Sequence, residues 1–120
     1  MILSLLVLRA REPWSLASFY EVLGLEFATE RHGRGPEHLS CSVNGSTLEI
    51  YPATESGGTT NTRIGFTVPD LDAAFSGVMS RQAQCLKEPC ETPWGRRAVI
   101  RDPEGHVVEL VEQSFEAAAA

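Results

Sequence analysis

The chain has 120 residues, of which 42% are hydrophobic and 22% charged, and its formal net charge is −6. This length supplies the core of one domain, and the composition is typical of a folded globular protein and not of a disordered one. The negative charge argues against nucleic acid or an anionic membrane surface as the main partner.

The three cysteines, Cys41, Cys85 and Cys90, cannot all pair with one another and form no CxxC motif. We therefore expect free, buried or half-buried thiols in a cytoplasmic protein. Residues 1–10 lack the basic segment and cleavage site of a signal peptide, and no apolar run is long enough to predict a membrane span.

The first half of the chain predicts a strand, a helix and three further strands. Residues 2–8 form a strand-length apolar run, and Pro13 suits the first turn of a helix that Gly24 ends. The apolar stripe of that helix is Leu16, Phe19, Tyr20 and Leu23. A short strand follows at 26–30, and then a glycine-rich loop at 31–37.

Asn44-Gly45 lies between two alternating runs, residues 38–43 and 46–51, and predicts a tight β-hairpin. Its register pairs Val43 with Ser46 and therefore Ser40 with Glu49. One face is then apolar, with Leu39, Cys41, Val43, Leu48 and Ile50, and the other carries His38, Ser40, Ser42, Thr47, Glu49 and Tyr51. The polar face is either the wall of a binding pocket or a plain solvent-facing surface.

The second half predicts the same order of elements. Residues 63–68 form a strand, and Asp70 N-caps a helix with the apolar stripe Leu71, Ala74, Phe75, Val78 and Met79. A strand at 85–91 precedes a hairpin, whose arms at 98–101 and 107–111 flank the turn Asp102-Pro103-Glu104-Gly105. Within the last arm Glu109 lies between Val108 and Leu110, so it points away from the core.

The two halves repeat in pattern around a linker at 54–60. Glu49 and Glu109 are 60 positions apart, and Leu5 and Arg63 are 58 apart. We expect an α+β fold in which one domain, residues 1–115, is built of modules 1–53 and 61–113. Residues 116–120 are expected to be a tail.

Several segments carry a resemblance to a known family: Phe19-Tyr20 with Leu23-Gly24, Thr47-Leu48-Glu49, Val68-Pro69-Asp70-Leu71, and Asp102-Pro103-Glu104-Gly105 with Glu109. In this order and spacing, over residues 3–112, the chain resembles the vicinal oxygen chelate superfamily, which includes glyoxalase I, extradiol dioxygenases and the bleomycin-resistance proteins. The resemblance implies two βαβββ modules whose mixed sheets curl around a cleft, usually in a homodimer.

In metal-dependent members of that family, the first and last strands of each module supply the ligands, and the matching positions here are Leu5, Glu49, Arg63 and Glu109. Leucine offers no lone pair, and arginine is always protonated and cannot ligate a cation. Two carboxylates alone make a poor site for a divalent transition metal. We therefore expect no cofactor and infer that the Arg63 guanidinium takes the place of the ion beside Glu109, and also neutralises Glu49. The alternative is a divalent metal held by Glu49 and Glu109 with further ligands that the sequence does not reveal.

The segment from Thr92 to Gly105 is similar to the bleomycin-resistance branch, which binds a drug without metal and without chemistry. Trp94 is then either a stacking surface for a flat or cationic ligand or a ring that packs its loop onto the sheet. Arg97 and Arg101 alternate onto the cleft face, where they would favour an anionic ligand. As a single imidazole on a mixed strand, His38 is expected to be a hydrogen-bonded structural residue. His106 is expected to be exposed and His32 to lie in a loop, and neither is assigned a role.

These observations favour a protein that binds a small organic molecule in the cleft of a homodimer. The predicted ligand-binding residues are Leu5, His38, Ser40, Glu49, Tyr51, Arg63, Trp94, Arg97 and Glu109. The alternatives are a metal-dependent lyase, isomerase or dioxygenase that uses Glu49 and Glu109, and metal-free acid–base catalysis by a glutamate of raised pKa.

Overall fold

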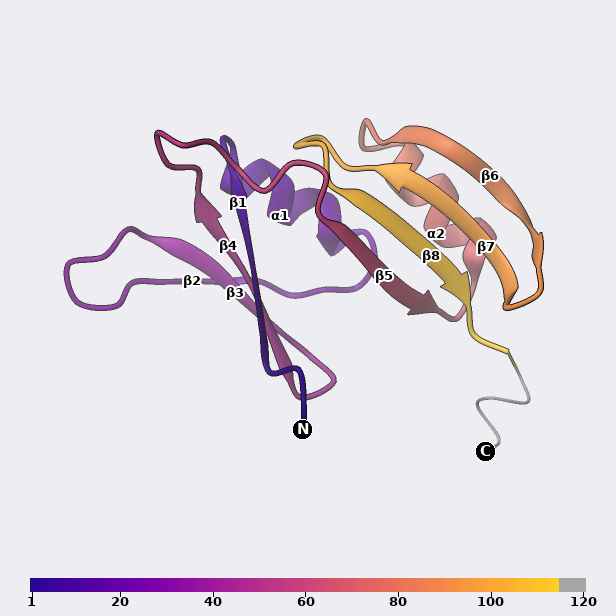
Figure 1. Cartoon of the computed structure of the whole chain (residues 1–120), viewed down its shortest axis with the longest axis horizontal. Helices are drawn as coiled ribbons and strands as arrows, with labels where there is room; N and C mark the ends of the chain where they lie inside the picture. The colour runs from indigo at the N-terminus through magenta and orange to yellow at the C-terminus, as the bar shows by residue number, and fades with distance from the viewer. Residues whose placement is uncertain (115–120) are drawn as a thin grey trace. The chain divides into compact units, whose positions relative to one another are not determined.

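A computed structural model describes residues 1–114, and the chain divides into two compact units, one ending at Thr60 and the other beginning at Asn61. The predicted tail, residues 116–120, lies outside the described residues. Figure 1 shows the elements of both units. Each unit has the order strand, helix, strand, strand, strand, so the predicted α+β fold of two βαβββ modules is confirmed.

The first unit contains β1 (Leu5–Ala10), α1 (Pro13–Glu21), β2 (Ala28–Glu30), β3 (His38–Val43) and β4 (Ser46–Pro52). Its sheet has the order β1-β4-β3-β2, in which β1 and β4 are parallel and the other pairs antiparallel. The Asn44-Gly45 hairpin has the predicted register from Val43 opposite Ser46 to Leu39 opposite Ile50. Asn44 and Gly45 both have positive φ, as this tight turn requires.

The second unit contains β5 (Arg63–Val68), α2 (Leu71–Met79), β6 (Gln84–Thr92), β7 (Gly95–Arg101) and β8 (Val107–Glu112). Its sheet order, β5-β8-β7-β6, repeats that of the first unit, and β5 and β8 are again the parallel pair. The predicted N-cap of α2 is confirmed, because Asp70 Oδ1 accepts a hydrogen bond from the backbone N–H of Ala73 at 3.1 Å.

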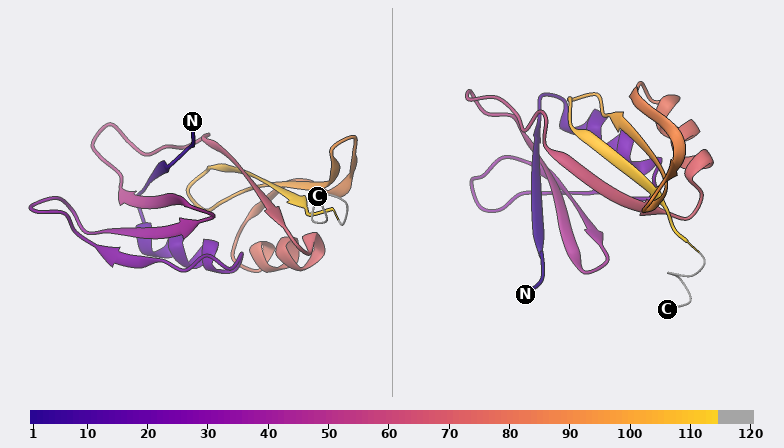
Figure 2. Two further views of the ribbon diagram at one scale, coloured as in Figure 1. Left: turned by 90° about the horizontal axis from the view of Figure 1, so that it is seen from below. Right: turned by 45° about the vertical axis from the view of Figure 1, so that its right-hand side comes forward.

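Each helix covers one face of its own sheet, as Figures 1 and 2 show. On α1 the buried residues include Leu16, Phe19 and Tyr20 of the predicted stripe. On α2 Leu71 and Val78 are buried, whereas Met79, which was predicted to join the stripe, is exposed at the helix end. The opposite face of each sheet is left to the polar side chains, and it is on those faces that the candidate site residues lie.

The bounds of the first strand and the burial of His106 also differ from the expectations. The first strand begins at Leu5 and not at Ile2, because residues 1–3 are exposed and the parallel pairing with β4 extends instead through Arg9 and Ala10. His106 is fully buried, not exposed. Its ring Nδ1 lies 2.8 Å from Asp102 Oδ2, and its backbone N–H donates to Asp102 Oδ1 at 3.0 Å, so the pair closes the turn between β7 and β8.

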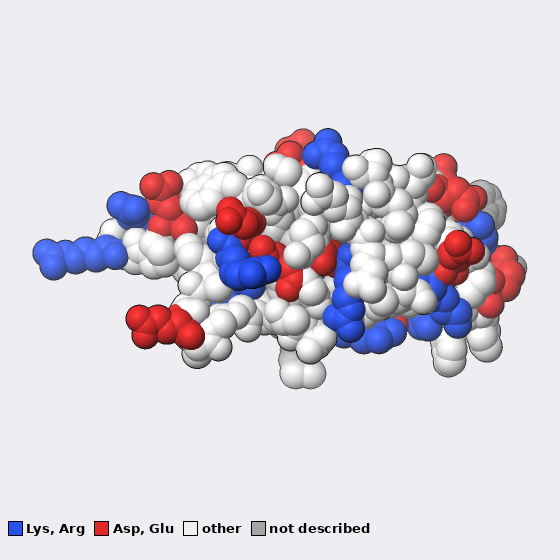
Figure 3. Space-filling model, turned by 90° about the horizontal axis from the view of Figure 1, so that it is seen from above, with Lys and Arg blue, Asp and Glu red and all other residues white. Residues whose placement is uncertain are grey.

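The cysteines are free thiols as predicted, with Cys41 buried and Cys85 and Cys90 half-buried. Burial raises the pKa of Cys41. Among the described residues, neither helix is long and apolar enough to cross a membrane. On the face drawn in Figure 3, acidic and basic side chains are interspersed, so no large basic patch is seen there.

Candidate functional site

The polar face of the first sheet brings together two histidines, two glutamates and a tyrosine. Sheet register places Glu30 opposite His38 and Ser40 opposite Glu49, so these side chains share the face away from α1. His38 is 1% exposed, and its ring stacks on Tyr51 at 4.0 Å between centroids and 9° between planes. The Arg9 guanidinium lies over the Tyr51 ring, 5.2 Å from the ring centroid.

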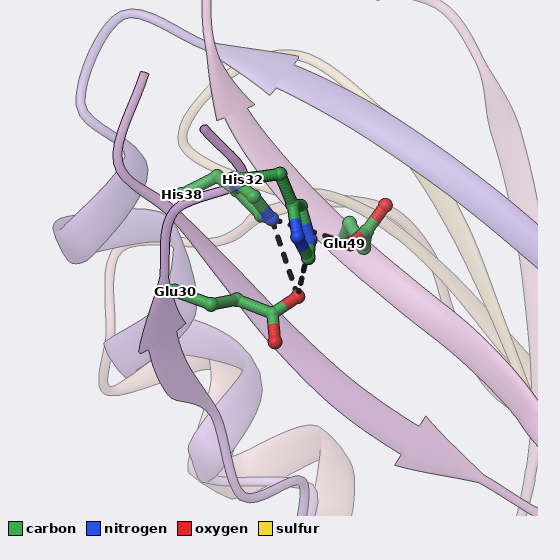
Figure 4. A group of neighbouring side chains, drawn as sticks. All are labelled: Glu30, His32, His38 and Glu49. Carbon is green, nitrogen blue, oxygen red and sulfur yellow. Dashed lines mark hydrogen bonds and ion pairs between the residues drawn. The ribbon is translucent and has the colours of Figure 1, made fainter. Parts of the chain in front are cut away.

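The His38 ring is oriented by hydrogen-bonding groups at both nitrogens. Nδ1 lies 3.2 Å from the Pro36 carbonyl oxygen, and Nε2 lies 3.2 Å from Glu30 Oε1 and 3.3 Å from Glu49 Oε2. His32 joins the group from the loop between β2 and β3, with its Nε2 3.4 Å from Glu30 Oε1. Figure 4 shows the four side chains converging on one point.

The electrostatics of this face favour the ionised form of Glu30 and the neutral form of Tyr51. Burial opposes ionisation of Glu30, but the hydrogen bond with His38 and the nearby His32 hold the pKa of Glu30 below its ordinary value. Partial burial, followed by the charges of Glu49 and Glu30, raises the pKa of Tyr51. Tyr51 is therefore a hydrogen-bond donor at neutral pH.

On the second sheet, Glu109 is bound by two arginines. Arg63 donates from Nε to Glu109 Oε1 at 3.0 Å and also contacts that oxygen through Nη2, and Arg97 Nη1 donates to the same oxygen at 3.2 Å. The hydrogen bond from Arg63 lowers the pKa of Glu109, and the positive charge of Arg97 adds to this effect. Glu109 is therefore an ionised acceptor at neutral pH, unlike a general base of raised pKa.

The remaining predicted site residues lie around these two groups. Ser40 is beside Glu49, and Leu5 is exposed on β1 opposite Thr47. Trp94 lies in the turn between β6 and β7 and is 80% exposed, so the alternative in which it packs the loop onto the sheet is wrong. Arg101 braces its own turn by donating to Asn61 Oδ1 at 3.0 Å and to the Gly105 carbonyl at 2.9 Å.

Glu30, His32 and Arg9 were missed from the sequence. Glu30 and His32 flank Arg31 ahead of His38, and the signal that connects them is the pairing of β2 with β3. That register places Glu30 directly opposite His38. A hydrogen bond from Gly35 N–H to the His32 carbonyl at 3.0 Å then closes the loop that returns His32 to the same face.

Comparison with known proteins gives a family. Residues 3–110 match the model of the Glyoxalase/Bleomycin resistance protein/Dioxygenase superfamily. The chain belongs to this superfamily. No curated protein sequence matches the chain significantly.

Several solved structures share the fold. TnmS3, an antibiotic binding protein from Streptomyces sp. CB03234, has a TM-score of 0.76 and 23% identity, and the match covers 95% of this chain and 97% of TnmS3. TioX from Micromonospora sp. ML1 has a TM-score of 0.70 and 21% identity over 92% of this chain and 97% of TioX. A superfamily member from Sphaerobacter thermophilus DSM 20745 has a TM-score of 0.73 and 20% identity over 94% and 98% of the two chains.

The divalent metal that the superfamily resemblance implies does not fit the four matching positions in this chain. Leu5 has no donor atom, and Arg63 brings a positive charge to the carboxylate that a metal would need. Arg97 binds the same oxygen of Glu109, so that carboxylate is already neutralised within its own unit. Glu49 is different, because its carboxylate faces His38 and Glu30.

Proposed function

We propose that this protein binds a small organic molecule, an antibiotic-like compound being the best-supported class, on the polar faces of its sheets in the cleft of a homodimer. No divalent metal is needed at Glu109. The observation that carries this proposal is the pair of arginine hydrogen bonds to Glu109 Oε1, from Arg63 at 3.0 Å and Arg97 at 3.2 Å. A guanidinium supplies the compensating charge that the family otherwise takes from an ion.

The nature of the two polar faces supports a bound organic molecule. Tyr51, Ser40 and the arginines supply hydrogen-bond donors around apolar and aromatic surface, which is typical of small-molecule sites. A hollow of about 420 Å³ on the first unit is lined partly by Ala28, Glu30, Ser40 and Ser42. TnmS3, an antibiotic binding protein, has the same fold, and this similarity supports the same class of ligand.

Trp94 is proposed as the stacking surface. The Trp94 indole is 80% exposed, so a flat ligand that covers it would bury a large apolar surface. A cationic ligand would gain further from the π face of the ring. The arginines instead favour an anionic group, so the proposal predicts a ligand with an aromatic part near Trp94 and a polar or anionic part near Arg63 and Arg97.

The test is a thermal-shift screen of metal-free bleomycin and a panel of planar aromatic antibiotics, followed by calorimetry of any compound that raises Tm. We expect at least one compound to bind with its Kd unchanged by EDTA and to be recovered intact. Trp94→Ala should weaken binding about tenfold, which corresponds to about 1.4 kcal/mol. Trp14→Ala is the matched control, because Trp14 is also exposed but lies on α1.

The alternative function, a metal-dependent enzyme using both Glu49 and Glu109, makes opposite predictions. It requires conversion of a bound compound, loss of that conversion in EDTA, and its loss in either Glu49→Gln or Glu109→Gln. That pattern would overturn the proposal. An absence of binding across the panel, with folded protein, would also contradict it.

A further inference from the structure

The side chains of Glu30, His32, His38 and Glu49 form a cluster on the first unit that the proposed function does not use as a unit. One ligand atom from each, a ring nitrogen or a carboxylate oxygen, lies within 4.8 Å of all the others. The residues come from the end of β2, the following loop, the start of β3 and the middle of β4 (Figure 4). Only Glu49 is shared with the positions that the family resemblance implies for a metal.

The groups around His38 determine which of its ring nitrogens carries the hydrogen. The Pro36 carbonyl oxygen, 3.2 Å from Nδ1, can only accept a hydrogen bond, so Nδ1 carries the hydrogen. In the neutral ring Nε2 then presents a lone pair, and it faces Glu30 Oε1 at 3.2 Å and Glu49 Oε2 at 3.3 Å. Carboxylate oxygens are also acceptors. Three acceptor atoms that face one another need either a proton or a metal ion between them.

Three of the separations between these atoms are close to those of a tetrahedral transition-metal site, and all four atoms lie within 4.8 Å of one another. With bonds of about 2.0–2.2 Å from zinc to nitrogen or oxygen, adjacent ligand atoms of a tetrahedron lie about 3.3–3.6 Å apart. These three separations are 3.2 Å and 3.3 Å from His38 Nε2 to the two glutamates and 3.4 Å from His32 Nε2 to Glu30. The hydrogen bond of His38 to a backbone carbonyl is also the support that metal-binding histidines normally have.

We propose that Glu30, His32, His38 and Glu49 bind one divalent transition-metal ion in the first unit, and that zinc fits the site. Two imidazoles favour zinc, nickel or copper over magnesium and calcium, which prefer oxygen ligands alone. Two carboxylates balance the charge of a divalent ion.

The burial of the four ligands gives the ion an entry path. His38 is 1% exposed, whereas the side chain of Glu49 is 12% exposed and that of His32 is 70% exposed. His38 and Glu49 thus form a fixed inner half on adjacent strands, and Glu30 and His32 close the site from the solvent side. The glycines at 33 and 35 in the loop allow it to turn back, with Gly33 at a φ of 58°.

The alternative to a metal ion is a second proton on His38, at Nε2. His38 would then be an imidazolium between Glu30 and Glu49. A metal and a proton differ in their need for His32. A proton on His38 is held by Glu30 and Glu49 alone, whereas a tetrahedral ion also requires the His32 nitrogen.

The experiment is calorimetric titration of untagged, chelator-treated and desalted protein with zinc chloride. We expect about one zinc ion per chain. His32→Gln and Glu30→Gln should each weaken zinc binding about tenfold or more, and neither removes a buried side chain. Glu37→Gln is the matched control, because Glu37 is an exposed glutamate of the same loop that pairs with Arg31 instead.

Two further measurements separate loss of the metal site from loss of the fold. Circular dichroism of each variant excludes a loss of fold as the cause of weaker binding, and cobalt substituted for zinc should give the visible absorption of a tetrahedral site. Zinc binding that is absent, or that is equal in wild type, His32→Gln and Glu30→Gln, would overturn the proposal. Because these residues all lie in the first unit, this outcome is independent of ligand binding that depends on Trp94 or Arg63.

Discussion

Glu49 and Glu109 occupy the same position in the two repeats but contact different side chains. Each is in the last strand of its module beside the parallel first strand, Glu49 opposite Val7 and Glu109 opposite Gly65. Glu49 lies 3.3 Å from the imidazole of His38, whereas Glu109 accepts hydrogen bonds from the guanidinium groups of Arg63 and Arg97. The carboxylate therefore recurs at the same place in both repeats, but its neighbour is an imidazole in the first unit and a pair of guanidinium groups in the second.

Replacing Arg63 with histidine should create metal affinity in the second unit. The substitution removes the charge that occupies the place of the ion and adds an imidazole beside Glu109. In a background of Glu30→Gln with His32→Gln, which disables the proposed site of the first unit, Arg63→His should bind zinc more tightly than the background protein does. Equilibrium dialysis measures this, and equal affinities would count against the assignment of Arg63 to the ion's place.

The ion pair of Glu109 should make stability depend on pH at the acid end. Arg63 holds the pKa of Glu109 below its ordinary value of 4.5, so the stabilisation is complete above that pH and is lost as pH falls through the lower folded value. Because Arg63 is well exposed, the effect is on the order of 0.5–1 kcal/mol. Urea unfolding at pH 7 and pH 3 should show a stability difference between wild type and Glu109→Gln that shrinks at pH 3. A difference that grows on acidification would contradict the sign.

Tyr51 should stabilise the first unit through its ring and not through its hydroxyl. The ring stacks on His38 at 4.0 Å and lies under the Arg9 guanidinium. Tyr51→Phe should therefore unfold at nearly the same urea concentration as wild type, whereas Tyr51→Ala should lose about 1–2 kcal/mol. Similar losses in both variants would assign the effect to the hydroxyl.

Asp102 should be among the most sensitive positions of the second unit. Its carboxylate accepts from the backbone N–H groups of Glu104 and His106 and contacts the His106 ring, which is fully buried. Asp102→Ala leaves these groups without that acceptor and should cost about 3 kcal/mol or more. Thermal unfolding measures the loss, and Glu104→Ala is the control, since it keeps its backbone N–H. A loss below that of the control would show that the turn does not depend on this carboxylate.

Much of the fold was accessible from sequence because its signals are local. The Asn44-Gly45 turn sets the register of its hairpin, and once that register is known the polar face with Ser40, Glu49 and Tyr51 follows from the alternation of strand side chains. The pairing of Glu109 with Arg63 also follows, since both occupy outward positions of neighbouring strands. These inferences need only the position of a turn and the alternation of side chains between the two faces of a strand.

The cluster around His38 could not be reached in the same way. Glu30 lies in a strand of three residues, which is too short to give a periodic signal, and its place opposite His38 comes from tertiary pairing. His32 reaches the cluster through the conformation of a loop. His106 was misjudged because a histidine beside a turn is normally exposed, and here Asp102 satisfies its ring inside the core.

The most direct test of this account is the zinc content of wild type, Glu49→Gln and Glu109→Gln after incubation with zinc and desalting. We expect about one ion per chain in wild type and in Glu109→Gln, and a clear loss in Glu49→Gln. This pattern would place the ion with the histidines of the first unit and leave Glu109 to its arginines. Loss of zinc in both variants would instead join the two glutamates in one metal site and contradict the proposed role of Arg63.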